Sequence, residues 1–170
     1  MRGFVLGVIA TLVALVIVVI VVTHRGLYPI GADNPPSHLE STLAGRAVDV
    51  YVDNHKPAGD NPIAPTAVNL TDGATQYEQH CALCHGGAKA KISPMQNQFS
   101  PPVPQLINRI PDDPSPWIFW VTKHGVRMTG MPAWTGILTD EDIWKIVAFI
   151  KNSDKLPPET RAAWQATAAN

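Results

Sequence analysis

The sequence predicts an all-α protein in which a compact helical domain follows a single N-terminal transmembrane helix. Three observations support this fold class. The first 25 residues contain a long uncharged apolar run, the later windows without proline have helical periodicity, and no stretch of 67–157 alternates for long enough to be a β-strand. The length of 170 residues suits one domain plus an anchor.

The composition excludes several classes of protein. The formal net charge is -1, and hydrophobic residues make up 45% of the chain. A nucleic-acid-binding protein would carry a clustered basic excess, so we expect no nucleic-acid partner. A disordered chain would be less hydrophobic and more highly charged. The two cysteines are too few for a disulfide scaffold or a four-thiolate zinc site.

The N-terminal segment 1–25 is expected to be a membrane anchor. Residues 4–22 carry no charge and consist mainly of Val, Ile and Leu. As a helix this run would be roughly 28 Å long, close to the ~30 Å hydrocarbon core of a bilayer. A cleaved signal peptide has a shorter apolar region and a small-residue cleavage site, which this sequence lacks. We therefore expect residues 4–22 to remain in contact with membrane lipid.

Prolines divide the rest of the chain into three further segments. Residues 26–66 form a polar, proline-rich connector, residues 67–157 form the folded domain, and residues 158–170 form a C-terminal tail. Within the connector, Ser37 and Glu40 have capping-box spacing, which predicts a short helix ending at about Val52.

Three helices of the domain have recognisable starts. Thr71 is expected to cap a helix that runs to about His80. Ser115 and Pro116 are expected to be the N-cap and the first residue of a second helix, which stops at Gly125. The third starts after Thr139, which precedes three acidic residues that suit a helix N-terminus. Its apolar positions recur at helical spacing: Ile143, Ile146, Val147 and Ile150.

One motif predicts the cofactor. Cys81, Cys84 and His85 form C-x-x-C-H, the attachment signature of c-type haem. Two thiols at this spacing on a helical turn reach both vinyl groups of one porphyrin, and the adjacent imidazole then lies under the iron. A thioredoxin-like pair would need a βαβ context, and a zinc site would need two more ligands. We therefore expect one covalent haem c, held by these three residues, with His85 bound to the iron.

The domain 67–157 resembles the single-haem class I cytochromes c. The similarity lies in the helix with Gly73 and Tyr77 that leads into the motif, in the segment 130–134 (Gly-Met-Pro-Ala-Trp), and in the closing helix within 138–150. With its anchor, the chain is similar to membrane-anchored cytochromes of bacterial respiratory chains. The resemblance implies a cytochrome c-like haem domain.

The resemblance also implies a methionine as the second axial ligand, and the sequence offers Met131 and Met128. Met131 matches the family motif and precedes Pro132, whose fixed φ would hold the loop against the haem. We therefore expect His85 and Met131 to be the iron ligands. A thioether favours reduced iron and raises the reduction potential. His124 and His55 are the alternative ligands.

The resemblance leaves the assignment of several haem-pocket residues open. The proximal imidazole is expected to donate to a proline carbonyl, for which there are three candidates: Pro94, Pro101 and Pro102. Leu106 and Trp120 are haem-wall candidates, although either would also suit the core. The propionate partner is Arg127 or Trp134, and Lys89 with Lys91 could face a partner or simply be solvated. The family fold also implies a helix crossing at four residues: Gly73, Tyr77, Ile146 and Phe149.

These features predict an electron carrier rather than an enzyme. Iron with a His/Met ligand pair has no open coordination position, so such a haem transfers electrons. The resemblance implies a haem domain in the periplasm, anchored in the bacterial inner membrane, with a respiratory dehydrogenase or terminal oxidase as redox partner. One alternative is a permanent cytochrome subunit of a larger membrane oxidoreductase complex. Another is a haem enzyme or gas sensor with a labile methionine ligand.

Overall fold

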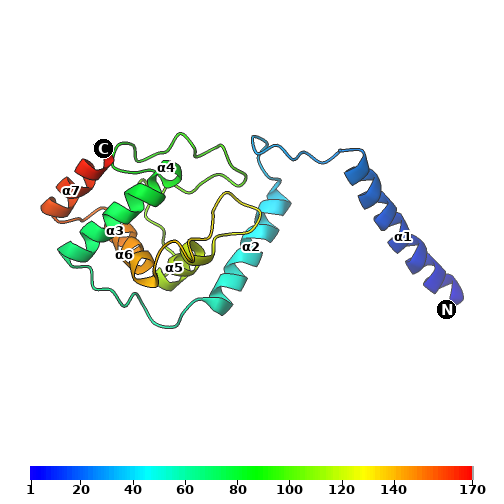
Figure 1. Ribbon diagram of the computed structural model, residues 1–170. Helices are drawn as coiled ribbons and strands as arrows, with labels where there is room; N and C mark the ends of the chain where they lie inside the picture. Colours follow the sequence, from blue (N-terminus) through cyan, green and yellow to red (C-terminus); the bar gives the residue numbers. More distant parts are fainter. Residues whose placement is uncertain (170) are drawn as a thin grey trace. The chain divides into compact units, whose positions relative to one another are not determined.

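The computed structural model describes residues 1–169, and every regular element in that range is a helix. The seven helices are shown in Figure 1: α1 Arg2–His24, α2 His38–His55, α3 Ala67–His80, α4 Ala82–His85, α5 Ser115–His124, α6 Asp140–Asn152 and α7 Pro158–Ala169. The all-α prediction is confirmed. The chain divides into two units, Met1–Asn34 and a larger unit that begins at Pro35.

The first unit consists of α1 and the segment after it. α1 is long and apolar enough to cross a membrane, as the sequence predicts. No side chain of α1 is buried by protein. The hydroxyls of Thr11 and Thr23 donate to carbonyls one turn earlier in the helix, so these polar groups are satisfied without water. The helix can therefore lie in lipid without exposing a free hydroxyl.

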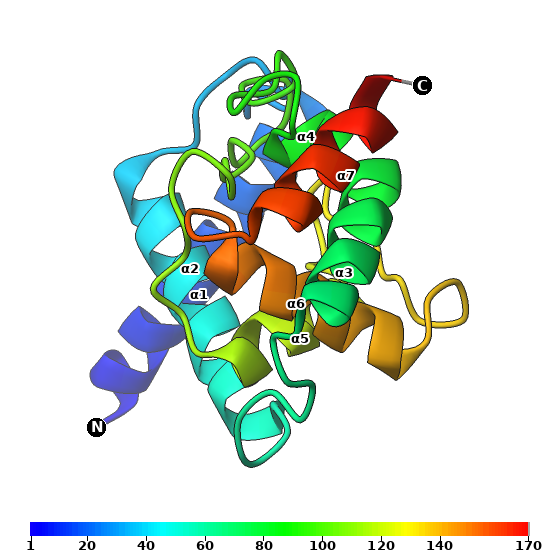
Figure 2. The same cartoon turned by 90° about the vertical axis from the view of Figure 1, so that its left-hand side faces the viewer.

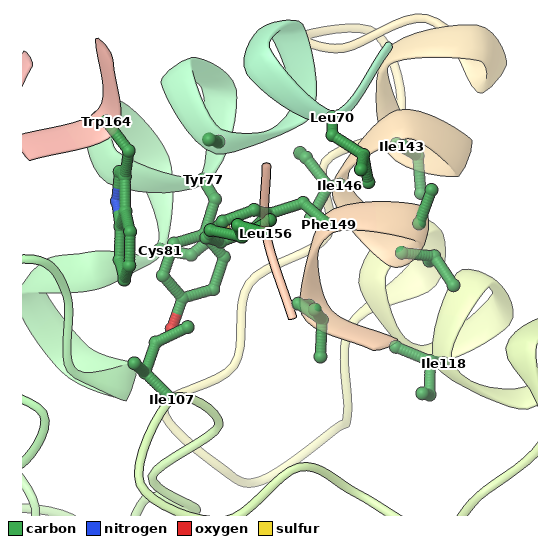
Figure 3. Close-up of a cluster of buried hydrophobic side chains, with 14 of the residues drawn as sticks. Leu70, Tyr77, Cys81, Ile107, Ile118, Ile143, Ile146, Phe149, Leu156 and Trp164 are labelled. Carbon is green, nitrogen blue, oxygen red and sulfur yellow. The ribbon is translucent and has the colours of Figure 1, made fainter. Parts of the chain in front are cut away.

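The centre of the second unit is the crossing of α3 and α6 (Figure 2). A Cβ atom added to Gly73 would lie 2.1 Å from the carbonyl oxygen of Lys145, so only glycine lets the two backbones approach this closely. Next to it, the rings of Tyr77 and Phe149 lie 5.2 Å apart. The predicted crossing is confirmed. Figure 3 shows the buried side chains that surround it.

Two of the predicted helix starts are confirmed by their caps. Ser37 and Glu40 form a capping box at the start of α2, which runs three residues beyond the expected end at Val52. Thr139 and Asp142 form a second capping box at the start of α6. Both starts depend on bonds within four residues, which explains why the sequence predicts them.

The starts of α3 and α5 differ from the prediction. α3 begins after Thr66, whose hydroxyl accepts the backbone N–H of Asn69, so Thr71 lies inside the helix instead of capping it. Thr66 has the extended backbone conformation that a cap residue needs. α5 spans Ser115–His124 and is followed by Gly125 as predicted, but Pro114 is the N-cap, so Ser115 is the first helical residue instead of the cap.

Two helices outside 67–157 pack onto the domain. In α2, Val52 is only 1% exposed, and the ring of Tyr51 lies 5.6 Å from that of Trp120 in α5. At the other end of the chain, α7 packs against α3, where Thr71 donates a hydrogen bond to Thr160 over 3.1 Å. The compact unit therefore includes a helix of the expected connector and a helix of the expected tail.

Candidate haem-binding site

The C-x-x-C-H motif lies on one helical turn at the end of α3. Cys81 caps α3, and the next four residues form the short helix α4. The backbone N–H of His85 donates to the carbonyl of Cys81 over 2.9 Å. Both cysteines are free thiols. The turn thus brings together the two thiols and the imidazole that the sequence predicts.

The side chain of His85 is held through one ring nitrogen. Its Nδ1 lies 2.8 Å from the carbonyl oxygen of Pro104. Because a carbonyl only accepts, Nδ1 carries the proton, and Nε2 keeps a free lone pair for a metal. Burial lowers the pKa of His85, and the bond to Pro104 partly opposes this effect. At pH 7 the imidazole is therefore neutral, which is the form that binds iron.

The proline acceptor is none of the three that the sequence suggested. Pro94, Pro101 and Pro102 lie elsewhere on the loop, and Pro104 occupies the position instead. The segment is fixed by a second bond, in which the backbone N–H of Leu106 donates to the carbonyl of His85 over 3.0 Å. Leu106, which the sequence suggested as a haem-wall or core residue, lies two residues after Pro104 and is half-buried against the core.

The carbonyl groups of residues 83–86 all accept hydrogen bonds from outside the turn. The donors are the Ser93 hydroxyl, the Gln105 side-chain amide, the Leu106 backbone and the Tyr77 hydroxyl. The buried Tyr77 hydroxyl donates to the carbonyl of Gly86 over 2.7 Å. No sequence pattern indicated the roles of Ser93 and Gln105, because they act through tertiary contacts. Together these bonds fix the backbone that carries the motif.

Burial keeps two groups of the site neutral. Burial, with a smaller contribution from the nearby Cys84 sulfur, raises the pKa of the Cys81 thiol to about 12. Burial also raises the pKa of the Tyr77 hydroxyl. Since the thiolate is the reactive form of cysteine, the Cys81 thiol has little reactivity once this fold is complete.

The two methionine candidates lie on one loop but in different environments. Met131 is half-buried, whereas Met128 is 97% exposed with a φ of 59°. The backbone of Met131 is held within the loop, since its N–H donates to the Thr129 hydroxyl over 3.1 Å and its carbonyl accepts from Val126 over 3.2 Å. The loop therefore turns Met128 toward solvent and Met131 toward the protein.

The comparison with protein families agrees with the motif. Residues 68–150 match the model of the family described as cytochrome c oxidase, cbb3-type, subunit III. This segment is a monohaem c-type cytochrome domain. No curated protein and no solved structure matches the chain. The match runs from the second residue of α3 to Ile150 in α6 and includes both expected iron ligands, while α2 and α7 lie outside it.

The cytochrome c-type domain indicates the cofactor, and the donor set of the site fits it. The cytochrome domain carries covalent haem c and serves haem-based electron transfer. Two free thiols stand on the same turn as a neutral imidazole whose Nε2 is available. These are the groups that attachment and proximal ligation of a haem require. The sequence-based prediction of a cytochrome c-type fold is confirmed.

The remaining candidates occupy several parts of the cytochrome domain. The ring of Trp120 contacts those of Tyr51 and His124, with centroids 5.6 Å and 4.7 Å away. His55 stacks on Tyr51 with ring centroids 4.0 Å apart. The two alternative histidine ligands therefore belong to an aromatic group where α2 meets α5. Trp134 lies 5.0 Å from His80. The other side chains considered for partner or propionate contacts are exposed: Arg127, Lys89 and Lys91.

Proposed function

We propose that this protein carries electrons through one haem, covalently attached at Cys81 and Cys84 and ligated by His85 and Met131. The observation that carries the proposal is the state of His85. Its Nδ1 is committed to Pro104, and Nε2 is left free on the same turn as two free thiols. The haem supplies one-electron chemistry, while the residues of the chain attach it, orient its proximal ligand and limit its contact with water.

The burial of Cys81 bears on when the haem becomes attached. Cys81 is buried at the C-terminal end of α3, and a pKa of about 12 leaves almost no thiolate at neutral pH. A thioether bond at this sulfur is therefore expected to form before the domain packs around it. We infer that attachment precedes the completion of the fold.

Met131 is the proposed second axial ligand. It is half-buried and precedes Pro132, whereas Met128 projects into solvent from a left-handed backbone position. A thioether ligand favours ferrous iron and raises the reduction potential. With His85 and Met131 both bound, the iron has no open position for a substrate. The protein is accordingly an electron carrier rather than an enzyme.

The anchor places this carrier at the membrane. We infer that α1 stays in the bacterial inner membrane and that the haem domain lies in the periplasm, where c-type haem is attached. Because α2 is docked on the haem domain, the link between α1 and the packed domain consists of residues 25–37. That segment spans at most roughly 45 Å when fully extended. The redox partners, a respiratory dehydrogenase or a terminal oxidase, are therefore reached close to the membrane surface.

Replacing the two methionines separately tests the ligand assignment. Met131→Ala should abolish the sulfur-to-iron band at the red end of the ferric spectrum and lower the reduction potential, because the thioether is lost. Met128→Ala is the matched control and should leave both unchanged, because this side chain is 97% exposed. Loss of the band in Met128→Ala alone would move the ligand to Met128, and a wild type without the band would contradict the His/Met assignment.

Replacing both cysteines tests the attachment site. Cys81→Ala combined with Cys84→Ala should give a protein without covalent haem, since the chain has only these 2 cysteines. Haem staining after denaturing electrophoresis measures the result. Staining that survives in the double variant would contradict attachment at the motif.

A second candidate function is that of a permanent subunit of a larger membrane oxidoreductase complex. Two observations favour it: the matched family is described as an oxidase subunit, and α2 carries exposed apolar side chains on the face opposite Val52. These side chains are Leu39, Leu43 and Val50. Purification from membranes in a mild detergent separates the two functions. A subunit brings its complex with it, whereas a free tethered carrier is recovered alone.

A further inference from the structure

We propose that Trp164 and Glu78 form a clamp through which helix α7 positions the haem-attachment turn and adjusts the reduction potential of the haem. The proposal rests on the electron-transfer function proposed above. It concerns α7, Pro158–Ala169, which lies outside the family-matching segment 68–150. Trp164 is a positioning residue in this scheme, because it acts on the haem only through other groups.

The clamp is a three-part contact at one carboxylate oxygen. The indole Nε1–H of Trp164 donates to Oε2 of Glu78 over 2.6 Å. The same oxygen accepts the backbone N–H of Ala88 over 3.2 Å. Ala88 lies three residues after His85, on the loop that leaves the motif. One side chain of α3 thus joins the C-terminal helix to the haem-attachment loop.

The loop is pressed closely against the Glu78 carboxylate. A Cβ atom added to Gly87 would lie 2.8 Å from both carboxylate oxygens and 2.7 Å from the Cβ of Ala82. The loop backbone at Gly87 thus lies directly against the Glu78 carboxylate. A displacement of Glu78 is therefore transmitted to residues 86–88.

A second route connects α7 to the same turn through packing. The Trp164 ring lies edge-on to Phe149 at 5.0 Å, and Phe149 lies 5.2 Å from Tyr77. Figure 3 shows these three side chains in one buried cluster. The Tyr77 hydroxyl then donates to the carbonyl of Gly86. Trp164 thus supports Gly86 by packing and Ala88 by hydrogen bonding.

The hydrogen-bonding route can be removed without undocking α7. The first turn of α7 is held separately by Thr160, whose hydroxyl donates to the carbonyl of Ala67 over 3.3 Å and accepts from Thr71. Trp164→Phe keeps an aromatic ring against Phe149 and removes the N–H donor together with the second ring of the indole, a loss of volume that the control Trp144→Phe shares. Without that donor the Glu78 carboxylate turns toward water, and the attachment loop becomes more hydrated. Hydration near a haem favours the more highly charged ferric state, because solvent access to a metal site controls its potential.

The experiment compares Trp164→Phe with Trp144→Phe in the full-length, haem-loaded protein in detergent. Trp144 is half-buried where Trp164 is buried, and its ring stacks on Phe119 of α5 at 4.1 Å instead of reaching Glu78. In Trp164→Phe we expect the equilibrium to shift toward ferric haem by about three- to tenfold. This is roughly 30–59 mV in a redox titration, since tenfold is 59 mV for one electron. Trp144→Phe should leave the potential unchanged.

Amide hydrogen exchange gives a readout that does not involve the haem electrons. Exchange in the segment 86–90 should become about tenfold faster in Trp164→Phe, which corresponds to the loss of one hydrogen bond to a charged group. Trp144→Phe should not change it. Glu78→Ala removes the acceptor while keeping Trp164 on Phe149, and it should accelerate exchange in 86–90 in the same way. The double variant should add little, because both changes remove one contact.

The outcomes separate this proposal from the proposed function. If Trp164→Phe lowers the melting temperature but leaves the potential and the exchange of 86–90 at wild-type values, Trp164 is only a packing residue and the clamp is wrong. Unchanged exchange in Glu78→Ala overturns it equally, even where Trp164→Phe does not accumulate. A wild type without covalent haem would overturn the proposed function instead, and the exchange measurements would still test the clamp.

Discussion

The two sides of the proposed haem site differ in how the chain holds them. On the attachment side, the carbonyls of residues 83–86 are all bonded by groups from other segments, and the turn rests on the buried crossing of α3 and α6. On the methionine side, the backbone of Met131 bonds only within its own loop. The core therefore positions the proposed proximal ligand, whereas the proposed methionine ligand depends on a short loop.

The largest effect is expected at the crossing that supports the attachment side. In Gly73→Ala, the new methyl group would lie 2.1 Å from the backbone oxygen of Lys145, so α3 and α6 must separate. We expect the free energy of unfolding to fall by about 3 kcal/mol, at the upper end of overpacking effects. Urea denaturation followed by haem absorbance measures this change.

Gly45→Ala is the matched control for that substitution. Gly45 lies inside α2, and a Cβ atom there would have nothing within 4 Å. Alanine in a helix interior should stabilise the protein by about 0.5–1 kcal/mol. If both variants were destabilised alike, the loss at Gly73 would reflect something other than the close approach of the two backbones.

An intermediate effect is expected when one bond to the attachment turn is removed. Tyr77→Phe keeps the ring on Phe149 but leaves the buried carbonyl of Gly86 without the hydroxyl donor. This should cost about 1–2 kcal/mol in thermal unfolding. Tyr51→Phe, at a tyrosine that is 55% exposed, should change stability by less than about 0.5 kcal/mol. Equal effects of the two changes would show that the attachment turn does not depend on the Tyr77 hydroxyl.

The smallest effect is expected on the methionine side. In Gly130→Ala the new methyl group meets the ring of Phe99 at 2.3 Å, and this half-buried side chain lies on a loop where it can rotate away. We expect a cost below about 1 kcal/mol in the same urea titration, at the low end of overpacking effects. A loss as large as that in Gly73→Ala would mean that both sides of the site are held equally firmly.

The sequence by itself determined the features that depend on neighbouring residues. The C-x-x-C-H motif lies on one turn because its spacing matches the helical period. The starts of α2 and α6 follow from capping boxes that close within four residues. The length and composition of α1 suffice for a membrane-spanning helix. The crossing at Gly73 was predicted as well, because the resemblance to class I cytochromes c implies that the helix with Gly73 packs against the closing helix.

Only the tertiary structure decided which distant segments meet these local elements. It gave His85 the carbonyl of Pro104, although three other prolines were equally suitable in sequence. It also docked α2 on α5, and it brought Trp164 of α7 to Glu78 of α3. None of these contacts leaves a local pattern, since each joins side chains from separate segments whose proximity depends on the packing of the whole domain. Hydrogen bonds and apolar burial of that kind are determined only when the complete fold closes.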